Sequence, residues 1–468
     1  MKRIIYTSAL AVAFAVTAIT GARAQVQQLK TSYFMEGSLP RYEMNAALTP
    51  QNSYFRFGFG GIGFGLNNRF TSVDKMLYPL ANGKMGTFMH PSVDASDFLG
   101  SLTKQPNLGI GFNYNLFGFG RYATDSKYFW SVDFNVRAEM DAVLPGALFG
   151  VMKDLGNKAY PAGKLGVDMM LFSELALGFS MPMPWENIVV GGRVKFLMGH
   201  AQATAQFSDL TIDLSGDDAM TTSVRGDFRA SVPGFSSKVD VGESGIIDDM
   251  FELKEDLMVG NVGDVLRGYG AAIDLGAELK LFDDRFKVSL GVNDLGFIAW
   301  NGRGATQAEI DELRAEYRGF DTAEDEVDFG TPDDMTGTVT GAGYNSRLST
   351  TLNVGAEYTF LDNMLGVGVL SHTRFGRIIT RSDLTITGTV RPAKWFTAAI
   401  SQTVTRNRFG ALGLALNFHP RGFNFFVGAD YLPANWARIE GIPLPRSGKS
   451  MNFYTGISFG LGGRSKPW

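Results

Sequence analysis

The sequence predicts an all-β protein, a transmembrane antiparallel β-barrel of about 14 strands (roughly 12–16). Three observations support this fold class. Segments in which apolar and polar residues alternate recur along nearly the whole chain, and a side-chain period of two is that of a strand with two unlike faces. The chain starts with a segment typical of export signals. No later apolar run approaches the ~20 residues of a membrane helix, so an integral protein would have to be a closed barrel.

The clearest alternation lies between Tyr269 and Asn293. Its halves, Tyr269–Leu281 and Phe286–Asn293, flank a short acidic turn at Asp283–Asp284, so the sequence predicts an antiparallel hairpin. One face of this hairpin carries no charge, whereas the other carries Asp, Glu and Lys. That pattern suits both the core face of a soluble sandwich and the lipid face of a barrel. The export signal, and strands longer than the ~5–6 residues usual in soluble sheets, favour the barrel.

Composition narrows the classes of function. The chain has 468 residues, no cysteine and a net charge of -4. Without cysteine there are no disulfides, no thiolate metal sites and no lipid-modified N-terminal cysteine. The 57 glycines and 37 phenylalanines, beside only 17 prolines, fit many strands joined by tight turns. A slightly acidic chain gives no reason to expect a nucleic acid partner.

Residues 1–24 form a predicted signal peptide. Two basic residues supply its charged start, an apolar part runs from Ile4 to Ala18, and Ala22-Arg23-Ala24 fits the small-x-small pattern before a cleavage site. We therefore expect a mature chain that begins at Gln25. An N-terminal membrane anchor is the less favoured alternative, because the apolar part is short. Export without cysteine predicts integration into a bacterial outer membrane after cleavage.

Residues 25–52 precede the first long strand and include a possible short strand at Thr31–Gly37. Residues 53–468 are expected to form the barrel. In its first part, Ser53–Phe70, a Gly60-Gly61 break predicts a hairpin. Further strands are expected at 108–116, 130–140, 167–183, 188–199, 202–214, 220–232, 351–360, 364–371, 383–391, 395–404, 411–418, 423–431 and 451–462.

Long insertions interrupt these strands, as in the outer loops of a barrel whose other turns are short. They lie at 71–105, 233–266 and 301–345. Short helices are expected at 145–155, 245–258 and 305–320. The last has a capping box formed by Thr306 and Glu309. The acidic stretch Asp321–Asp334 lacks the carboxylate spacing of an EF-hand and is interpreted as a solvated loop.

Several short blocks resemble a known group of proteins. Thr31–Gly37 with Arg41 and Asn45-Ala-Ala-Leu, then Gly192–Gly199 and Asn293–Trp300, are similar to outer-membrane barrels of the Bacteroidota that carry a domain of unknown function. More distantly, the segment at Asn45 resembles the Asn-Pro-Ala element of FadL-type transporters, with Ala46 in place of proline. The FadL resemblance implies a barrel of about 14 strands that passes hydrophobic molecules, with residues 25–52 as a hatch in the lumen. Its hatch residues here would be Pro40, Arg41 and Asn45.

Signals for catalysis are weak, so we expect no enzyme, no cofactor and no metal site. The four histidines, His90, His200, His372 and His419, lie in different segments and none has metal-ligand spacing. Each is interpreted as a polar loop or strand-end residue. The glycines between Gly58 and Gly65 lack the Lys-Ser/Thr and the helix of a phosphate loop.

Charged residues on the polar parity of the strands are expected to point into the lumen. They form either a structural ladder of ion pairs or a constriction that selects what passes, because buried charges must be paired or hydrated. Arg41 and Asn45 would pair with this ladder from the hatch. The residues are Asp133, Arg137, Glu139, Asp168, Glu174, Arg193, Lys195, Asp274, Glu278, Lys280 and Glu357.

Two functions from different classes follow. The first is a FadL-like transport or channel protein for small hydrophobic or amphipathic molecules. The alternative is a non-transporting barrel that anchors or scaffolds an envelope or secretion complex through its long loops. An apolar pocket lined by lumen-facing residues such as Met170, Phe172 and Leu197 would favour transport, and a lumen packed solid with ion pairs would favour the scaffold. The expected partners are outer-membrane lipid, with a small hydrophobic ligand or an envelope protein.

Overall fold

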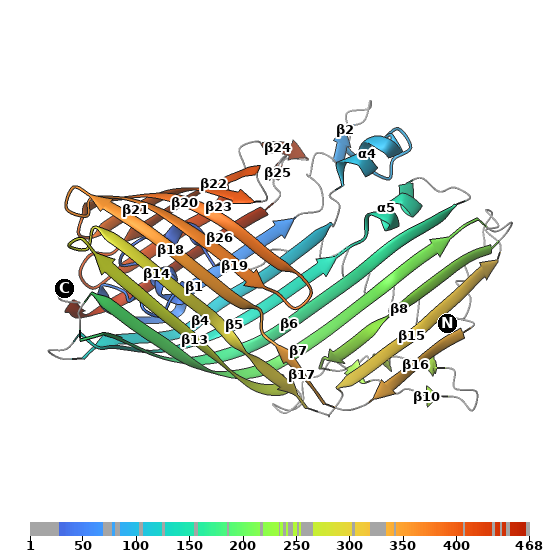
Figure 1. Ribbon diagram of the computed structural model, residues 1–468, viewed down its shortest axis with the longest axis horizontal. Coiled ribbons are helices and arrows are strands. Elements are labelled where there is room, and N and C mark those ends of the chain that lie inside the picture. The colour runs from blue at the N-terminus through green and yellow to red at the C-terminus, as the bar shows by residue number, and fades with distance from the viewer. Residues whose placement is uncertain are drawn as a thin grey trace.

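A computed structural model gives the fold of the chain (Figure 1). It describes residues 28–68, 77–79, 85–102, 106–123, 127–153, 158–184, 187–215, 219–233, 235–236, 240–241, 247–249, 252–253, 265–301, 305–318, 334–340, 343–405, 408–432, 436–439, 442–445 and 450–464. The predicted signal peptide and most of the acidic stretch 321–334 lie outside these residues.

Fourteen antiparallel strands form a closed barrel, which confirms the predicted fold class. The ring closes because the last strand pairs with the first, with Phe55 opposite Phe459, while the other edge of the first strand pairs with β4. The strands in order around the wall are β1 (Asn52–Asn68), β4 (Asn107–Tyr122), β5 (Phe129–Val143), β6 (Ala159–Pro182), β7 (Ile188–Asp213), β13 (Gly268–Leu281), β14 (Phe286–Trp300), β18 (Thr350–Phe360), β19 (Leu365–Phe375), β20 (Thr380–Ala393), β21 (Phe396–Thr405), β22 (Arg408–Phe418), β23 (Asn424–Leu432) and β26 (Ser450–Arg464).

The two ends of the barrel differ. One end carries short connections, such as the four residues between Leu281 and Phe286. The strand β1 begins at this end and β26 finishes there, since Asn52 pairs with Arg464. The other end carries the long connections, which hold α4 (Ala95–Ser101), α5 (Gly146–Lys153), β2 (Leu77–Pro79), β3 (Met85–Thr87), β9 (Phe235–Ser236), β10 (Asp240–Val241), β11 (Ile247–Asp249), β12 (Glu252–Leu253), β24 (Trp436–Ile439) and β25 (Ile442–Pro445).

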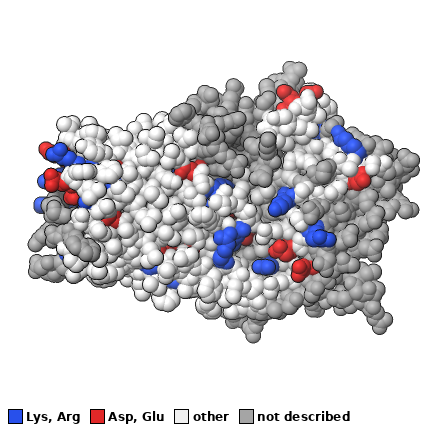
Figure 2. All heavy atoms as spheres, viewed as in Figure 1, with Lys and Arg blue, Asp and Glu red and all other residues white. Residues whose placement is uncertain are grey.

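Inward and outward faces alternate as the hairpin at 269–293 predicts. Leu275 points outward and is 53% exposed, whereas its neighbour Asp274 is 0% exposed inside the barrel. Between the charged rim at the left of Figure 2 and the more charged right half, the outer surface is largely free of charge. Apolar side chains exposed on this surface include Leu177, Phe196, Ile273, Leu290, Val367, Ile386, Ile400 and Leu414.

A sheet extension continues from the barrel at its long-loop end. The strand β7 has 26 residues and therefore spans roughly 85 Å at about 3.3 Å per residue. Its second half pairs with β8 (Ala219–Ser231), which pairs with β15 (Thr306–Arg318), and β15 pairs with β16 (Asp334–Thr340). A short strand, β17 (Tyr344–Arg347), returns the chain to the wall beside β14.

Four local predictions were wrong. Residues 305–320 were expected to form a helix but contain β15, because the free edges of β8 and β16 supply pairing that overrides helix propensity. The described part of 245–258 holds the short strands β11 and β12 instead of a helix. In place of the hairpin expected at Ser53–Phe70, the structure has one 17-residue strand, β1, from Asn52 to Asn68, with a register shift at the glycines. Thr31–Gly37 pairs with no strand and starts in a 3-10 turn.

The helix predicted at 145–155 is present as α5. Its Phe149 packs with Phe98 of α4 in a small apolar cluster above the barrel. Among the described residues, no helix is long and apolar enough to cross a membrane.

Candidate functional site

The segment from Gln28 to Gln51, called the N-terminal segment below, lies inside the barrel next to its short-turn end (Figure 1). It contains η1 (Lys30–Ser32) and α2 (Leu39–Met44), where Pro40 occupies the first turn of the helix. Nearly all of its side chains are buried. The segment contributes no strand to the sheet, so side chains of the wall hold it in place.

A row of three glycines forms the seat of this segment. Gly276 on β13 pairs with Gly191 on β7 and with Gly291 on β14, so the three lie side by side across the wall. A Cβ built on any of them would lie closer than 3.0 Å to atoms of Met44–Ala47. The wall therefore has no side chains here because the segment lies directly on its backbone.

Polar residues continue the same row on both sides of the glycines. Ser180 pairs with Gly191, and its hydroxyl donates to the carbonyl of Ala46 over 2.6 Å. On the other side Asn353 pairs with Gly291, and its Nδ2 donates to the carbonyl of Met44 over 3.0 Å. Together, the glycines and their polar neighbours fix the position of the backbone at residues 44–47.

The far end of the row holds the start of the segment. Asp383 on β20 lies 2.8 Å from Nζ of Lys30, and the Tyr431 hydroxyl contacts the same ammonium. The carboxylate of Asp430 accepts hydrogen bonds from the backbone N–H groups of Lys30 and Thr31, over 2.8 and 3.0 Å. These acceptors satisfy the free N–H groups at the start of η1.

Every charged side chain of the N-terminal segment meets an opposite charge on the wall. Besides Lys30, Glu36 pairs with Lys287, Arg41 with Glu278 at 3.0 Å, and Glu43 with Arg56 at 2.8 Å. Burial raises the pKa of the Glu36 carboxyl, but the charges of Lys287 and Arg391 outweigh burial and hold that pKa well below its usual value. The segment and the wall are thus electrostatically complementary.

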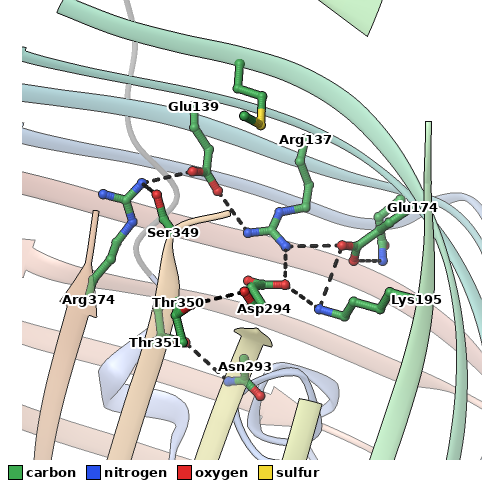
Figure 3. Close-up of polar contacts among 12 residues, drawn as sticks. Arg137, Glu139, Glu174, Lys195, Asn293, Asp294, Ser349, Thr350, Thr351 and Arg374 are labelled. Carbon is green, nitrogen blue, oxygen red and sulfur yellow. Dashed lines mark hydrogen bonds and ion pairs between the residues drawn. The ribbon is translucent and has the colours of Figure 1, made fainter. Parts of the chain in front are cut away.

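A network of ion pairs crosses the lumen beside the segment (Figure 3). Arg137 on β5 contacts Glu139, Glu174 and Asp294 at 2.9–3.1 Å. Six cationic and six anionic side chains are linked in this charge network, so the charges balance and each desolvated group has a partner. Its members are Arg137, Arg193, Lys195, Arg374, Arg377, Arg381, Glu139, Asp141, Asp168, Glu174, Asp274 and Asp294.

Between the charge network and the N-terminal segment lies a cavity of about 70 Å³. Leu29, Pro40 and Met44 line it from the segment, and Arg137 and Lys195 are among the residues that line it from the wall. A single water needs about 10–15 Å³ of such volume, so the cavity has room for roughly five to seven waters. In this state the lumen is closed at the level of the network.

A β-bulge on β14 determines which side chains of this strand point into the lumen. Asn293 and Asp294 both lie opposite Asp274, and both point inward with 0% and 2% exposure. Asp294 adopts a left-handed conformation with φ of 62°. Beyond the bulge the parity of the strand is reversed, because one extra residue has been inserted. Leu295 therefore points outward, and Ile298 points inward.

An apolar cluster follows the charge network toward the long-loop end. On β6, β7 and β13 its residues lie two positions beyond network residues, as Phe172 does from Glu174 and Leu197 from Lys195. The guanidinium of Arg137 lies 5.2 Å from the ring centre of Phe172, which joins the two layers. The cluster comprises Met170, Phe172, Leu197, Ala272, Ile298, Trp300, Ala305, Tyr344 and Leu348.

The structure places all eleven predicted lumen charges inside the barrel and joins most of them in the network. Asp133 pairs with Arg56, Glu357 pairs with Arg391, and Lys280 lies 4.0 Å from Glu278. Of the predicted hatch residues, Arg41 pairs with Glu278, Asn45 donates to the carbonyl of Leu290 over 3.1 Å, and Pro40 borders the cavity.

Sequence reasoning missed two groups of lumen residues. Arg374, Arg381 and Asp383 share the polar parity of β19 and β20; the alternation argument would have found Asp383, whereas Arg374 and Arg381 lie beyond the predicted strands 364–371 and 383–391. Asp294 and the inward apolar residues after it carry no such signal, since the bulge that turns them inward is not visible in the alternation.

In the described part of the chain, no three His, Asp or Glu side chains are arranged to hold a metal ion. His200 Nε2 lies 2.7 Å from the Ser173 hydroxyl, but its other ring nitrogen faces the backbone carbonyl of Val265. A triad would place a carboxylate there. His372 contacts the side chain of Asn353.

Residues 46–430 match the model of a family of unknown function, DUF5723. The chain belongs to this family. Among curated proteins, none matches the chain by sequence.

Solved structures similar to this chain include FadL-type outer-membrane transporters. They include the Ralstonia pickettii toluene transporter TbuX, at 8% identity, TM-score 0.41, and 91% of this chain and 94% of that chain covered. The Pseudomonas putida toluene transporter TodX has 9% sequence identity and a TM-score of 0.36, with 92% of this chain and 92% of that chain covered. A Pseudomonas aeruginosa FadL homologue has 8% sequence identity and a TM-score of 0.39, with 94% of this chain and 100% of that chain covered.

Proposed function

We propose that this DUF5723 protein is an outer-membrane barrel that admits a small apolar or amphipathic molecule when its N-terminal segment moves within the lumen. The location is supported by a closed sheet with an apolar outer surface (Figure 2), since lipid excludes water from the exterior and a closed ring leaves no unpaired strand edge. Short turns at one end and long loops at the other are typical of outer-membrane barrels. The proposal includes cleavage of the signal peptide before Gln25.

The observation that carries the transport proposal is the way in which the lumen is closed. The N-terminal segment fills it without adding a strand to the barrel, and charged contacts such as Lys30–Asp383 and Arg41–Glu278 hold it. Removal of the segment would therefore leave every strand pair of the wall intact. If the N-terminal segment served only as a structural core, we would expect the strand pairing of the barrel to depend on it.

The apolar cluster indicates the class of molecule. Met170, Phe172 and Leu197 face the lumen between the long loops and the charge network. These side chains are buried against one another, so a molecule that enters from the loop end would have to separate them before it could bury its own apolar surface there. The charge network and the N-terminal segment then block the way, because the cavity between them has room only for roughly five to seven waters.

Conductance in planar bilayers tests this proposal. The mature protein is compared with a variant that lacks residues 25–51. This deletion stops just before the first residue of β1. We expect a closed native protein and steady conductance in the truncated variant. The control is the unboiled electrophoretic mobility of both proteins, which shows that the barrel is folded. A folded truncated variant that conducts no more than the native protein would contradict the transport proposal.

A second function, a surface anchor or scaffold, is favoured by the sheet extension. A membrane-spanning strand needs about 9–11 residues, whereas β7 has 26 and continues into pairing with β8. The extension therefore offers a large surface beyond the lipid. Deletion of the extension tests the scaffold: loss of an envelope complex with an unchanged truncation conductance would favour it over transport.

A further inference from the structure

The β14 bulge contacts both the N-terminal segment and the charge network, which together close the lumen. Asn293 donates its Nδ2 to the carbonyl of Met44 in the N-terminal segment, over 2.7 Å. The next residue, Asp294, accepts from Arg137 and Lys195 in the charge network. Figure 3 shows the two side chains on adjacent positions of β14, with Asp294 toward Arg137 and Lys195. Without the bulge, consecutive residues of a strand would point to opposite faces.

The conformation of the bulge depends on its neighbours. A non-glycine residue in the left-handed region is disfavoured, and Asp294 has φ of 62°. Its backbone N–H donates to Asp274 Oδ1 over 2.7 Å, and its carbonyl accepts from the Thr350 hydroxyl over 3.2 Å. Such a conformation persists only while the surrounding contacts hold it.

The Met44 carbonyl also accepts from a second asparagine. Asn353 on β18 donates to it over 3.0 Å, yet Asn353 lies in regular pairing, opposite Gly291 and His372. Both asparagines therefore hold the same atom of the segment, and only Asn293 adjoins the bulge. This pair provides a matched comparison between holding the segment and coupling it to the network.

We propose that Asn293 and Asp294 couple the N-terminal segment to the charge network, so that the two barriers open together; this inference rests on the proposed function. When Met44 leaves its seat, Asn293 keeps only its longer contact with the Thr351 hydroxyl, over 3.4 Å, and the bulge relaxes toward regular pairing. Asp294 then no longer bridges Arg137 and Lys195, and the network separates at the point where it borders the cavity. By linkage, loss of the Asp294 bridge to Arg137 and Lys195 must in turn loosen the segment.

The test uses the absence of cysteine in the chain. A single cysteine at the buried position Ala47 reports release of the segment through its rate of modification by a water-soluble thiol reagent. Asp294→Asn removes the charge but keeps a residue that tolerates the left-handed conformation. We expect it to raise the rate about tenfold, within the usual range of coupling between sites. The matched control is Glu139→Gln, which removes a network charge paired with Arg137 and Arg374 away from the bulge.

Double variants locate the coupling. The Asp294→Asn effect should vanish in an Asn293→Ala background, because the link is already cut, and persist in an Asn353→Ala background. Equal rates for Asp294→Asn and Glu139→Gln, or an effect that survives in both backgrounds, would overturn the coupling. The labelling rate requires no transport, so the coupling can fail while the truncated barrel still conducts. A silent truncated barrel would instead contradict the proposed function.

Discussion

Nζ of Lys30 lies 2.8 Å from Oδ2 of Asp383, and both side chains are buried in the lumen although 353 positions separate them in the chain. Lys30 belongs to the N-terminal segment and Asp383 to the wall. A pair of buried charges is stable only while both members are present. The contact therefore acts as a lock between the segment and the barrel.

Removal of the charge of Lys30 should release the segment. A Lys30→Met variant leaves Asp383 buried without its cation, which costs about 3–5 kcal/mol. We expect faster modification of a cysteine at Ala47. The double variant with Asp383→Leu should restore much of the slow rate, since the Asp383 carboxylate that the single variant leaves without Lys30 is then removed. Equal rates for the single and double variants would show that the pair does not hold the segment.

The glycine seat gives a steric test of the same segment. Leucine at Gly276 would place atoms where Asn45 and Ala47 now lie, so we expect displacement of the segment and conductance through an otherwise folded barrel. The matched control is Gly388→Leu, because a Cβ there meets only the Ile400 side chain at an ordinary 3.6 Å. Single-channel recordings of the two variants make the comparison. A Gly276→Leu barrel that stays closed would show that the segment does not depend on the glycine row for its position.

An arginine on the outer surface tests the membrane location. Leu275 is exposed on the wall, so Leu275→Arg would be nearly neutral in water but costs about 2–4 kcal/mol near the middle of a bilayer. The control is Met89→Arg, at an exposed position in the long connection before β4, where we expect a change within about 0.5 kcal/mol. Urea unfolding in lipid vesicles measures both. Equal small effects would show that Leu275 does not face lipid.

The sequence predicts the barrel because alternation is a local property of each strand. Asp274 and Leu275 face opposite sides, as their parity requires. The strand Thr306–Arg318 was mistaken for a helix because its pairing partner β8 lies more than 70 positions away, and distant pairing outweighs local propensity. Such partners leave no mark in the segment itself.

The site could be predicted only where it depends on local alternation and not on distant contacts or an inserted residue. Residues in regular alternation, such as Arg137 and Lys195, were placed in the lumen from sequence alone. The bulge at Asn293–Asp294 inserts a residue, so every later position of β14 changes face and Ile298 becomes an inward residue. The contacts of Lys30 depend on how the segment folds back into the barrel, which no local pattern records.

Acid should release the segment only well below the usual range of glutamate titration. The charges of Lys287 and Arg391 hold the pKa of Glu36 well below its usual value despite burial. A carboxyl with a depressed pKa in the folded state stabilises that state above its ordinary pKa of about 4.3, and this contribution is lost as the pH falls through the depressed value. We therefore expect the native protein to stay closed in bilayers from pH 7 to about 4.3 and to open at lower pH.

The Glu36→Gln variant separates this carboxyl from the other acids of the lumen. Without the charge, Lys287 has lost its partner Glu36 at every pH, so we expect openings already at pH 7 and a flatter dependence of conductance on pH. Other buried carboxylates, such as Asp383, remain in the variant and keep their own titration. If native and variant barrels open over the same pH range, the Glu36–Lys287 pair is not the group that acid breaks first.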